Sequence, residues 1–100
     1  MNCYILTYNI RNESHNYSDL YNTIKKEYPL NWHLTENSWI LFSENGDDGK
    51  AIAAKLKDKF VFEDYHCDSF SVFKLDTSYD CDGMAAKSFW KFLKENMEKC

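Results

Sequence analysis

Residues 4–11, which read YILTYNIR, decide the fold expected for this chain. Together with Cys3 they form a near-continuous run of apolar, aromatic and β-branched residues, a pattern typical of a strand buried on both faces. The run reaches a polar residue at Asn9, and a stretch of loop composition follows at 11–16. We therefore predict a first strand at about 3–10, with Asn9 at the end that faces a loop.

Outward from this strand, the apolar side chains switch between helical and extended spacing. Helical spacing predicts three helices, at about 18–28, 48–60 and 84–97. Strand-like runs predict three further strands, at about 31–36, 38–43 and 69–76. Ser18 is the expected N-cap of the first helix.

The resulting order, β-α-β-β-α-β-α, predicts an α+β fold. Its first six elements fit the ferredoxin-like βαββαβ arrangement, an antiparallel four-stranded sheet with helices on one face and with the first and last strands as neighbours. The additional C-terminal helix, at 84–98, is expected as an appendage to a core at 1–77, within a single domain that covers residues 1–100.

Charge and cysteine usage narrow the class of protein. A net charge of −4 argues against a protein that coats nucleic acid non-specifically, which would be basic, although a local basic face remains compatible with it. The apolar run at 4–8 is too short for a signal peptide or a membrane span, so we expect a cytoplasmic protein with no membrane partner. The four cysteines are scattered and match no zinc-binding spacing, so we expect free thiols and predict no metal site.

Six segments carry a resemblance to a known family: YILTYNI, YSDLYNTIKKEY, WHLTENSWILFSE, AIAAKLKDKF, DSFSVFKLD and FWKFLKENM. Over most of the chain they resemble small bacterial and phage proteins described as SinR-like. These proteins are similar to the second CRISPR-associated protein, Cas-two, and more distantly to virulence-associated protein D. The resemblance implies a homodimer. It also implies a first strand ending in Tyr-Asp-Ile or similar, whose aspartate, one from each subunit, is implicated in holding a divalent metal for phosphodiester cleavage.

The matching triplet in this chain is Tyr8-Asn9-Ile10. An asparagine oxygen offers a hard cation a dipole in place of a charge, so two opposed asparagines would hold Mg²⁺ poorly and would stabilise less charge during phosphoryl transfer. We therefore expect a protein that is not an enzyme and has no cofactor. Under the alternative, a metal-dependent endonuclease using Mg²⁺ or Mn²⁺, the candidate catalytic residues are Asn9, Glu13 and His15. A third reading is that Asn9 simply caps the turn that follows it.

Charged side chains are unevenly distributed along the chain. The cations predicted to contact nucleic acid are Arg11, Lys25, Lys26, Lys50, Lys55, Lys57 and Lys59. The carboxylates predicted to contact a basic partner are Asp64, Asp68, Asp76, Asp80 and Asp82. The same distribution is also compatible with solvated helix faces and an acidic loop surface that keep the protein soluble.

Three hypotheses about function follow from these observations. The leading one is a non-catalytic, homodimeric binding or regulatory module of the SinR-like or Cas-two-like type, associated with nucleic acid. The first alternative is the metal-dependent endonuclease acting on RNA or DNA. The second alternative is a phage-type anti-defence protein that binds a host enzyme through its acidic surface.

Overall fold

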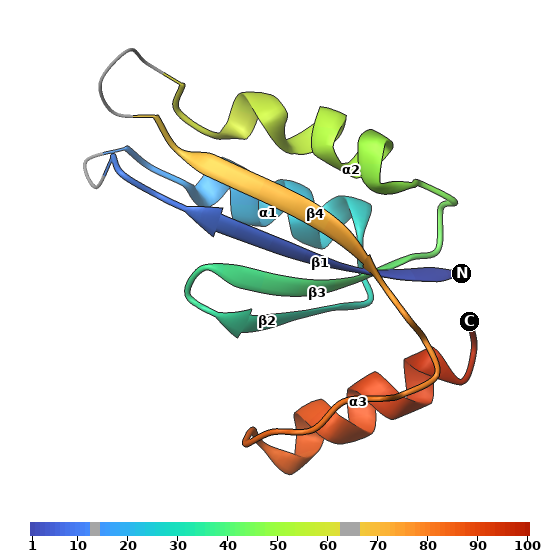
Figure 1. Ribbon diagram of the computed structural model, residues 1–100. Helices are drawn as coiled ribbons and strands as arrows, with labels where there is room; N and C mark the ends of the chain where they lie inside the picture. Colours follow the sequence, from blue (N-terminus) through green and yellow to red (C-terminus); the bar gives the residue numbers. More distant parts are fainter. Residues whose placement is uncertain (13–14, 63–66) are drawn as a thin grey trace.

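The part of the chain that the structure describes folds into one four-stranded antiparallel sheet and three α-helices (Figure 1). The computed structural model describes residues 1–12, 15–62 and 67–100. Its elements in chain order are β1 (Asn2–Asn9), α1 (Ser18–Glu27), β2 (Asn31–Thr35), β3 (Ser38–Ser43), α2 (Gly49–Leu56), the 3₁₀ helix η1 (Lys57–Lys59), β4 (Ser69–Leu75) and α3 (Lys87–Met97). Within the described residues, none of the helices is long and apolar enough to cross a membrane.

The strands are arranged in the order β2-β3-β1-β4, and all neighbouring pairs are antiparallel. β1 therefore lies inside the sheet, where both of its edges are hydrogen-bonded, and its residues Cys3, Tyr4, Leu6 and Tyr8 are buried. The prediction of a strand buried on both faces is confirmed for the face that carries Tyr4, Leu6 and Tyr8. On the other face Cys3 is buried, whereas Ile5 and Thr7 are half-buried. The predicted pairing of the first and last strands is also confirmed, and all four predicted strands agree with the observed ones within one residue at each end.

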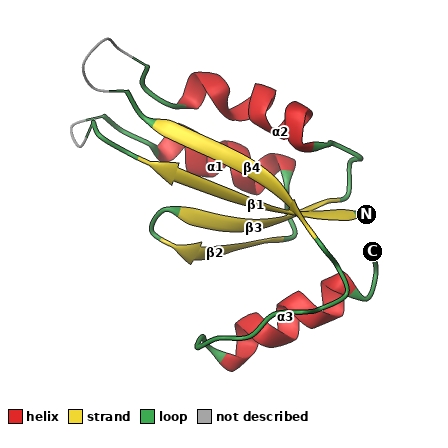
Figure 2. Ribbon diagram, viewed as in Figure 1, coloured by secondary structure: helices red, strands yellow, loops and turns green. Residues whose placement is uncertain are grey.

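The first face of the sheet is covered by α1 and α2, which lie side by side on it (Figure 2). Trp39 of β3 is the largest fully buried side chain, and its indole Nε1 donates a hydrogen bond to the Tyr8 hydroxyl at 3.0 Å. This core also contains Leu20 and Ile24 of α1 and Ile52 of α2, whose side chains are fully buried. The helical spacing of these residues explains why α1 and α2 form here, because each buries one apolar stripe.

The helix ends differ from the predictions in ways that local hydrogen bonds explain. Ser18 is the first residue of α1 and not its N-cap: the cap position is Tyr17, and the side chain of Asn16 accepts from the Ser18 backbone N–H. Asp48 caps α2 by accepting from the Ala51 N–H at 2.9 Å. After Leu56 the chain tightens into η1, so the α-helical part of this segment is shorter than expected.

The second face of the sheet is covered by α3, on the side opposite to α1 and α2 (Figure 1). Phe89, Leu93 and Met97 of this helix are buried against Ile40 and Phe42 of β3. The sequence led us to expect the last helix as an appendage. Instead its side chains form a second buried cluster with the sheet, because strand residues that point away from α1 and α2 are apolar and need their own cover.

Candidate functional site

Asn9 is the last residue of β1, is exposed, and pairs with Ser69 of β4. Of the other two candidate catalytic residues, His15 is exposed and packs edge-on against the Tyr17 ring with 4.8 Å between centroids. Glu13 lies outside the described residues. Within the part of the chain that the structure describes, no three His, Cys, Asp or Glu side chains come close enough together to hold a metal ion.

Asp68 ties together the two loops beside this strand end. Its side chain accepts hydrogen bonds from the Arg11 and Val61 backbone N–H groups, each at 2.8 Å, and from the side chains of Asn12 and Tyr17. Burial alone would raise the pKa of Asp68, but these hydrogen bonds outweigh it and hold the pKa below the usual carboxyl range. Asp68 is thus a buried, ionised side chain that holds the two loops together, with 5 % of its surface exposed.

This burial removes Asp68 from the predicted acidic contact surface. A carboxylate that is already satisfied by four donors inside the fold has no lone pairs facing a partner. Asp64, predicted for the same surface, lies outside the described residues. The remaining three predicted carboxylates, Asp76, Asp80 and Asp82, are exposed and lie on the linker between β4 and α3.

The predicted cations divide into paired and exposed groups. Lys55 forms ion pairs with Asp47 at 2.6 Å and with Glu27 at 3.2 Å, and Lys59 pairs with Asp19 at 3.5 Å. These two lysines therefore tie together the helical layer. The other five, Arg11, Lys25, Lys26, Lys50 and Lys57, are exposed, and their contact with nucleic acid stays a prediction.

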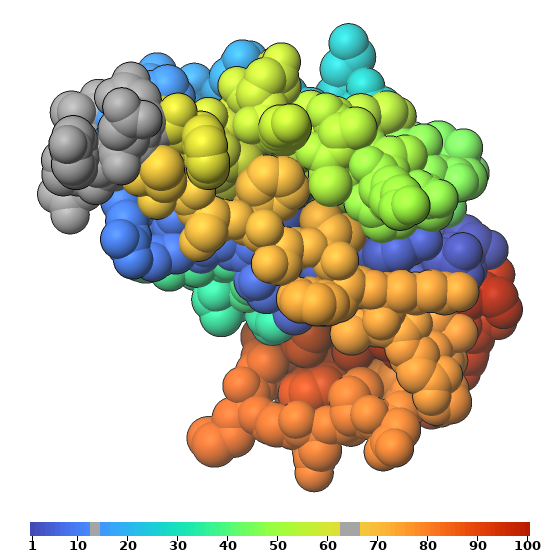
Figure 3. All heavy atoms as spheres, turned by 45° about the horizontal axis from the view of Figure 1, so that its top comes forward, coloured from blue at the N-terminus to red at the C-terminus, as the bar shows by residue number. Residues whose placement is uncertain are grey.

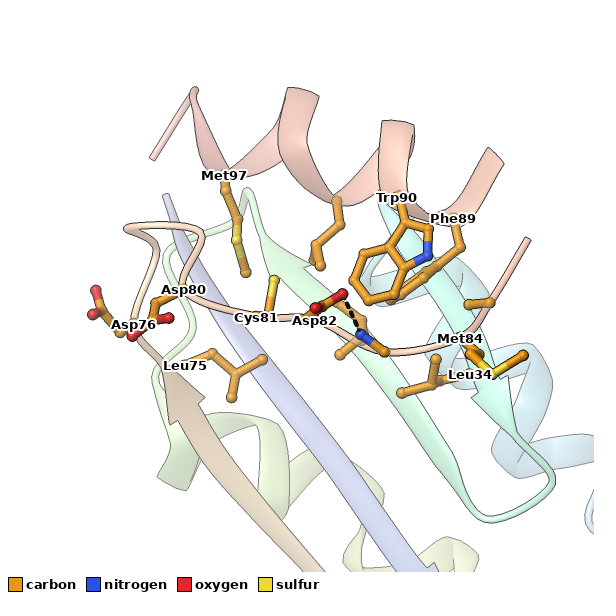
Figure 4. Close-up of a pocket in the computed structure, with 14 residues that line it drawn as sticks. Leu34, Leu75, Asp76, Asp80, Cys81, Asp82, Met84, Phe89, Trp90 and Met97 are labelled. Atoms are coloured by element: carbon orange, nitrogen blue, oxygen red, sulfur yellow. Dashed lines mark hydrogen bonds between the residues drawn. The ribbon is translucent and has the colours of Figure 1, made fainter. Parts of the chain in front are cut away.

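A cavity of about 510 Å³ lies between α3 and the second face of the sheet (Figure 4). The linker at 76–86 runs past it and contributes Asp76, Asp80 and Asp82 to its lining; in Figure 4, Asp82 lies between Cys81 and the Trp90 ring. The apolar walls come from all three elements around it: Leu34, Ile40 and Leu75 of the sheet, Phe89, Trp90, Leu93 and Met97 of α3, and Met84 and Ala85 of the linker.

The Cys81 side chain points towards α3 inside this cavity (Figure 4). Desolvation of the thiol, followed by the charges of Asp80 and Asp82 beside it, raises the pKa of Cys81. Burial likewise raises the pKa of Cys3 to about 12. Cys3, Cys81 and Cys100 are free thiols, as the scattered spacing predicted, and Cys3 and Cys81 are held as neutral thiols that are poor nucleophiles.

Sequence reasoning identified the acidic linker but not the cavity beside it. The face of the sheet that α1 and α2 do not cover carries the apolar side chains of Trp32, Ile40 and Phe42. These apolar side chains were the sequence signal that a further element packs on this face. The space-filling view shows the linker and α3 as a lobe beside the sheet (Figure 3).

Comparison of the chain with models of protein families, with curated proteins and with solved structures finds no match.

Proposed function

We propose that this protein is a non-catalytic binding module that acts as a homodimer, with the ferredoxin-like arrangement of the SinR-like and Cas-two-like proteins that its sequence resembles. The strand order β2-β3-β1-β4 supports this arrangement, since it places the first and last strands together and both connecting helices on one face. The amide of Asn9 at the end of β1 supports a module without phosphodiester chemistry, because it is neutral where the family's aspartate is charged.

The observation that carries the proposal is an uncovered part of the second sheet face. α3 covers this face over β2 and β3, whereas Phe73 of the outer strand β4 is 59 % exposed. Phe73 is the register partner of Ile5, so the two side chains stand next to each other on one face. A large apolar side chain exposed beside a half-buried one is the composition expected of a protein interface.

A second copy of this chain is the occupant that fits this surface best. Beyond Phe73 and Ile5 the same face carries Thr7 paired with Ser71, and then Asn9 paired with Ser69. None of these six side chains is charged, so two chains with a net charge of −4 each can meet here without placing like charges in contact. Among the described residues, β4 is an outer strand of the sheet, so a symmetric copy can approach its outer backbone edge.

In a dimer built on this face, the two Asn9 residues would share the interface. Asn9, Thr7 and Ile5 alternate along β1 and therefore point to the same side of the sheet. A two-fold axis close to this row would bring the amides of both copies near each other. That placement agrees with the resemblance, which implies opposed residues at this position.

Sedimentation of the wild type and of two matched variants tests the proposal. We expect a dimer at micromolar concentration, a monomer for Phe73→Ser, and an unchanged dimer for Phe62→Ser. Phe62 is a suitable control because it is 86 % exposed and lines a pocket with Ala53 and Ala54 of α2, a helix on the first face of the sheet. A wild type that sediments as a monomer, or a Phe73→Ser variant that remains a dimer while folded by circular dichroism, would overturn the proposal.

A further inference from the structure

We propose that the cavity between α3 and the sheet binds a small organic cation, with its apolar body among the helix and strand side chains and its charge at the aspartates of the linker. This site is separate from the proposed dimer surface, since neither Phe73 nor Ile5 lines it. The two proposals can therefore fail independently.

The size and walls of the cavity suit a small ligand. A volume of about 510 Å³ falls within the range of roughly 300–1,000 Å³ typical of small-molecule sites. Ile40, Phe89 and Leu93 contribute side chains that are at most 4 % exposed, so the apolar end of the cavity belongs to the packed core. The sheet, α3 and the linker bound the space on three sides, a shape that admits a compact molecule more readily than a helix or strand of a partner.

The negative charge at the rim of the cavity favours a positively charged ligand. Three of the residues that line the cavity are aspartates, and none is a lysine, arginine or histidine. None of the ion pairs formed by the described residues involves these aspartates. The hydroxyl and backbone N–H of Ser78 both donate to Asp76, and these bonds lower the pKa of that carboxyl, so it is ionised at neutral pH.

Aromatic side chains in the same space add a second preference for a cation. Trp90 lines the cavity, and its ring packs against Phe89 with 5.0 Å between centroids. The face of an indole attracts a cation within about 6 Å of its centroid. Asp82 lines the same cavity, and a Cβ placed on its neighbour Gly83 would lie 3.8 Å from the Trp90 ring, so a bound ammonium group can contact the carboxylate and the indole together. Among the described residues, the one hydrogen bond that the Asp82 carboxylate accepts is local, from the Gly83 N–H, so the carboxylate keeps capacity for this contact.

Three probes of equal shape and different charge test the inference. They are 4-phenylbutylammonium, the neutral 4-phenylbutanol and the anionic 4-phenylbutanoate, titrated into the full chain by calorimetry and by tryptophan fluorescence. We expect saturable binding of the ammonium probe, about tenfold tighter than the alcohol, with the carboxylate probe weakest. Added salt should reduce the preference for the cation and leave the affinity for the alcohol nearly unchanged.

Two matched double variants test whether the preference for a cation depends on the aspartates of the linker. Asp80→Asn with Asp82→Asn should bring the affinity for the ammonium probe down to that of the alcohol. Asp19→Asn with Asp58→Asn makes the same change in net charge, but these residues are about 80 % exposed in the helical layer on the other face, so the preference should persist. Equal binding of cation and alcohol by the wild type, a preference that survives loss of Asp80 and Asp82, equal losses in both double variants, or no binding of any probe would each overturn the inference.

Discussion

Among the carboxylates of the described residues, Asp68 is the one whose replacement should destabilise the fold most. Three of the four groups that donate to it belong to Arg11, Asn12 and Tyr17, and the fourth is the backbone N–H of Val61. The side chain therefore connects the loop after β1 with the segment before β4. In Asp68→Ala all four donors lose their acceptor. At about 1 kcal/mol for each bond, we expect a loss of about 4 kcal/mol in the free energy of unfolding. That is a large part of the roughly 5–15 kcal/mol typical of a domain of this size.

The isosteric variant Asp68→Asn separates hydrogen bonding from packing. Its amide oxygen can still accept from Arg11 and Asn12, and the Tyr17 hydroxyl can turn to accept from the new amide. The Val61 N–H cannot turn, so one donor is left without a partner, at a cost of about 2 kcal/mol. We therefore expect Asp68→Asn to lie about midway between the wild type and Asp68→Ala.

The pH dependence of stability provides a second measurement on the same variants. Because the folded-state pKa of Asp68 lies below its ordinary value of 3.8, the charge contributes stability above that value, and this contribution is lost as the pH falls through the folded-state pKa. The gap between the wild type and Asp68→Asn should therefore narrow in acid.

Urea denaturation followed by circular dichroism at neutral and acidic pH measures both effects. Asp58→Ala serves as the control, since its carboxylate is 80 % exposed and its loss should change stability by no more than about 0.5 kcal/mol. An Asp68→Ala variant as stable as Asp58→Ala would refute the inference that the hydrogen bonds of Asp68 stabilise the fold by joining the two loops.

Two further substitutions test the helix on the second face and the end of β1. Leu93→Ala should cost about 2–4 kcal/mol in urea denaturation because the side chain is 4 % exposed, whereas exposed Lys94→Ala should be nearly neutral; equal costs would mean that α3 is loosely attached. Asn9→Asp should lower the melting temperature without metal, through repulsion between two close carboxylates in the proposed dimer, and Mn²⁺ should restore it. Identical melts of Asn9→Asp with and without Mn²⁺ would show that position 9 is not part of a metal site.

Local patterns were enough to predict the sheet. The apolar runs through β1 and β3 identify strands of a covered sheet, because apolar residues at consecutive positions of a strand point to both faces, and both faces then need a packed layer. Features of this kind depend on near neighbours in the chain and are readable from them.

The role of Asp68 and the position of α3 depend on residues distant in the chain. Asp68 has the appearance of one more surface carboxylate in an acidic segment, because two of its four donors are backbone N–H groups that any residue supplies. The start of α3 is missed for a local reason: Met84 to Ala86 are apolar enough for a helix, but the backbone of Ala86 is extended, so Ala86 is the N-cap and the helix begins at Lys87. The linker path, and hence the cavity beside it, follows from that delayed start.

The two ends of the described chain lie close together, which matters for how the protein can be joined to others. Figures 1 and 3 both place the N-terminal residues beside the C-terminal ones, and Met1 packs against the buried cluster that includes Met97. Asn9 is at the opposite end of β1, one full strand away. A short peptide could therefore link the ends, with new termini opened at the exposed turn 36–37 between β2 and β3, to give a circular permutant with the same sheet. For the same reason, insertion of the whole chain into a loop of another protein would leave the Asn9 end pointing away from its host.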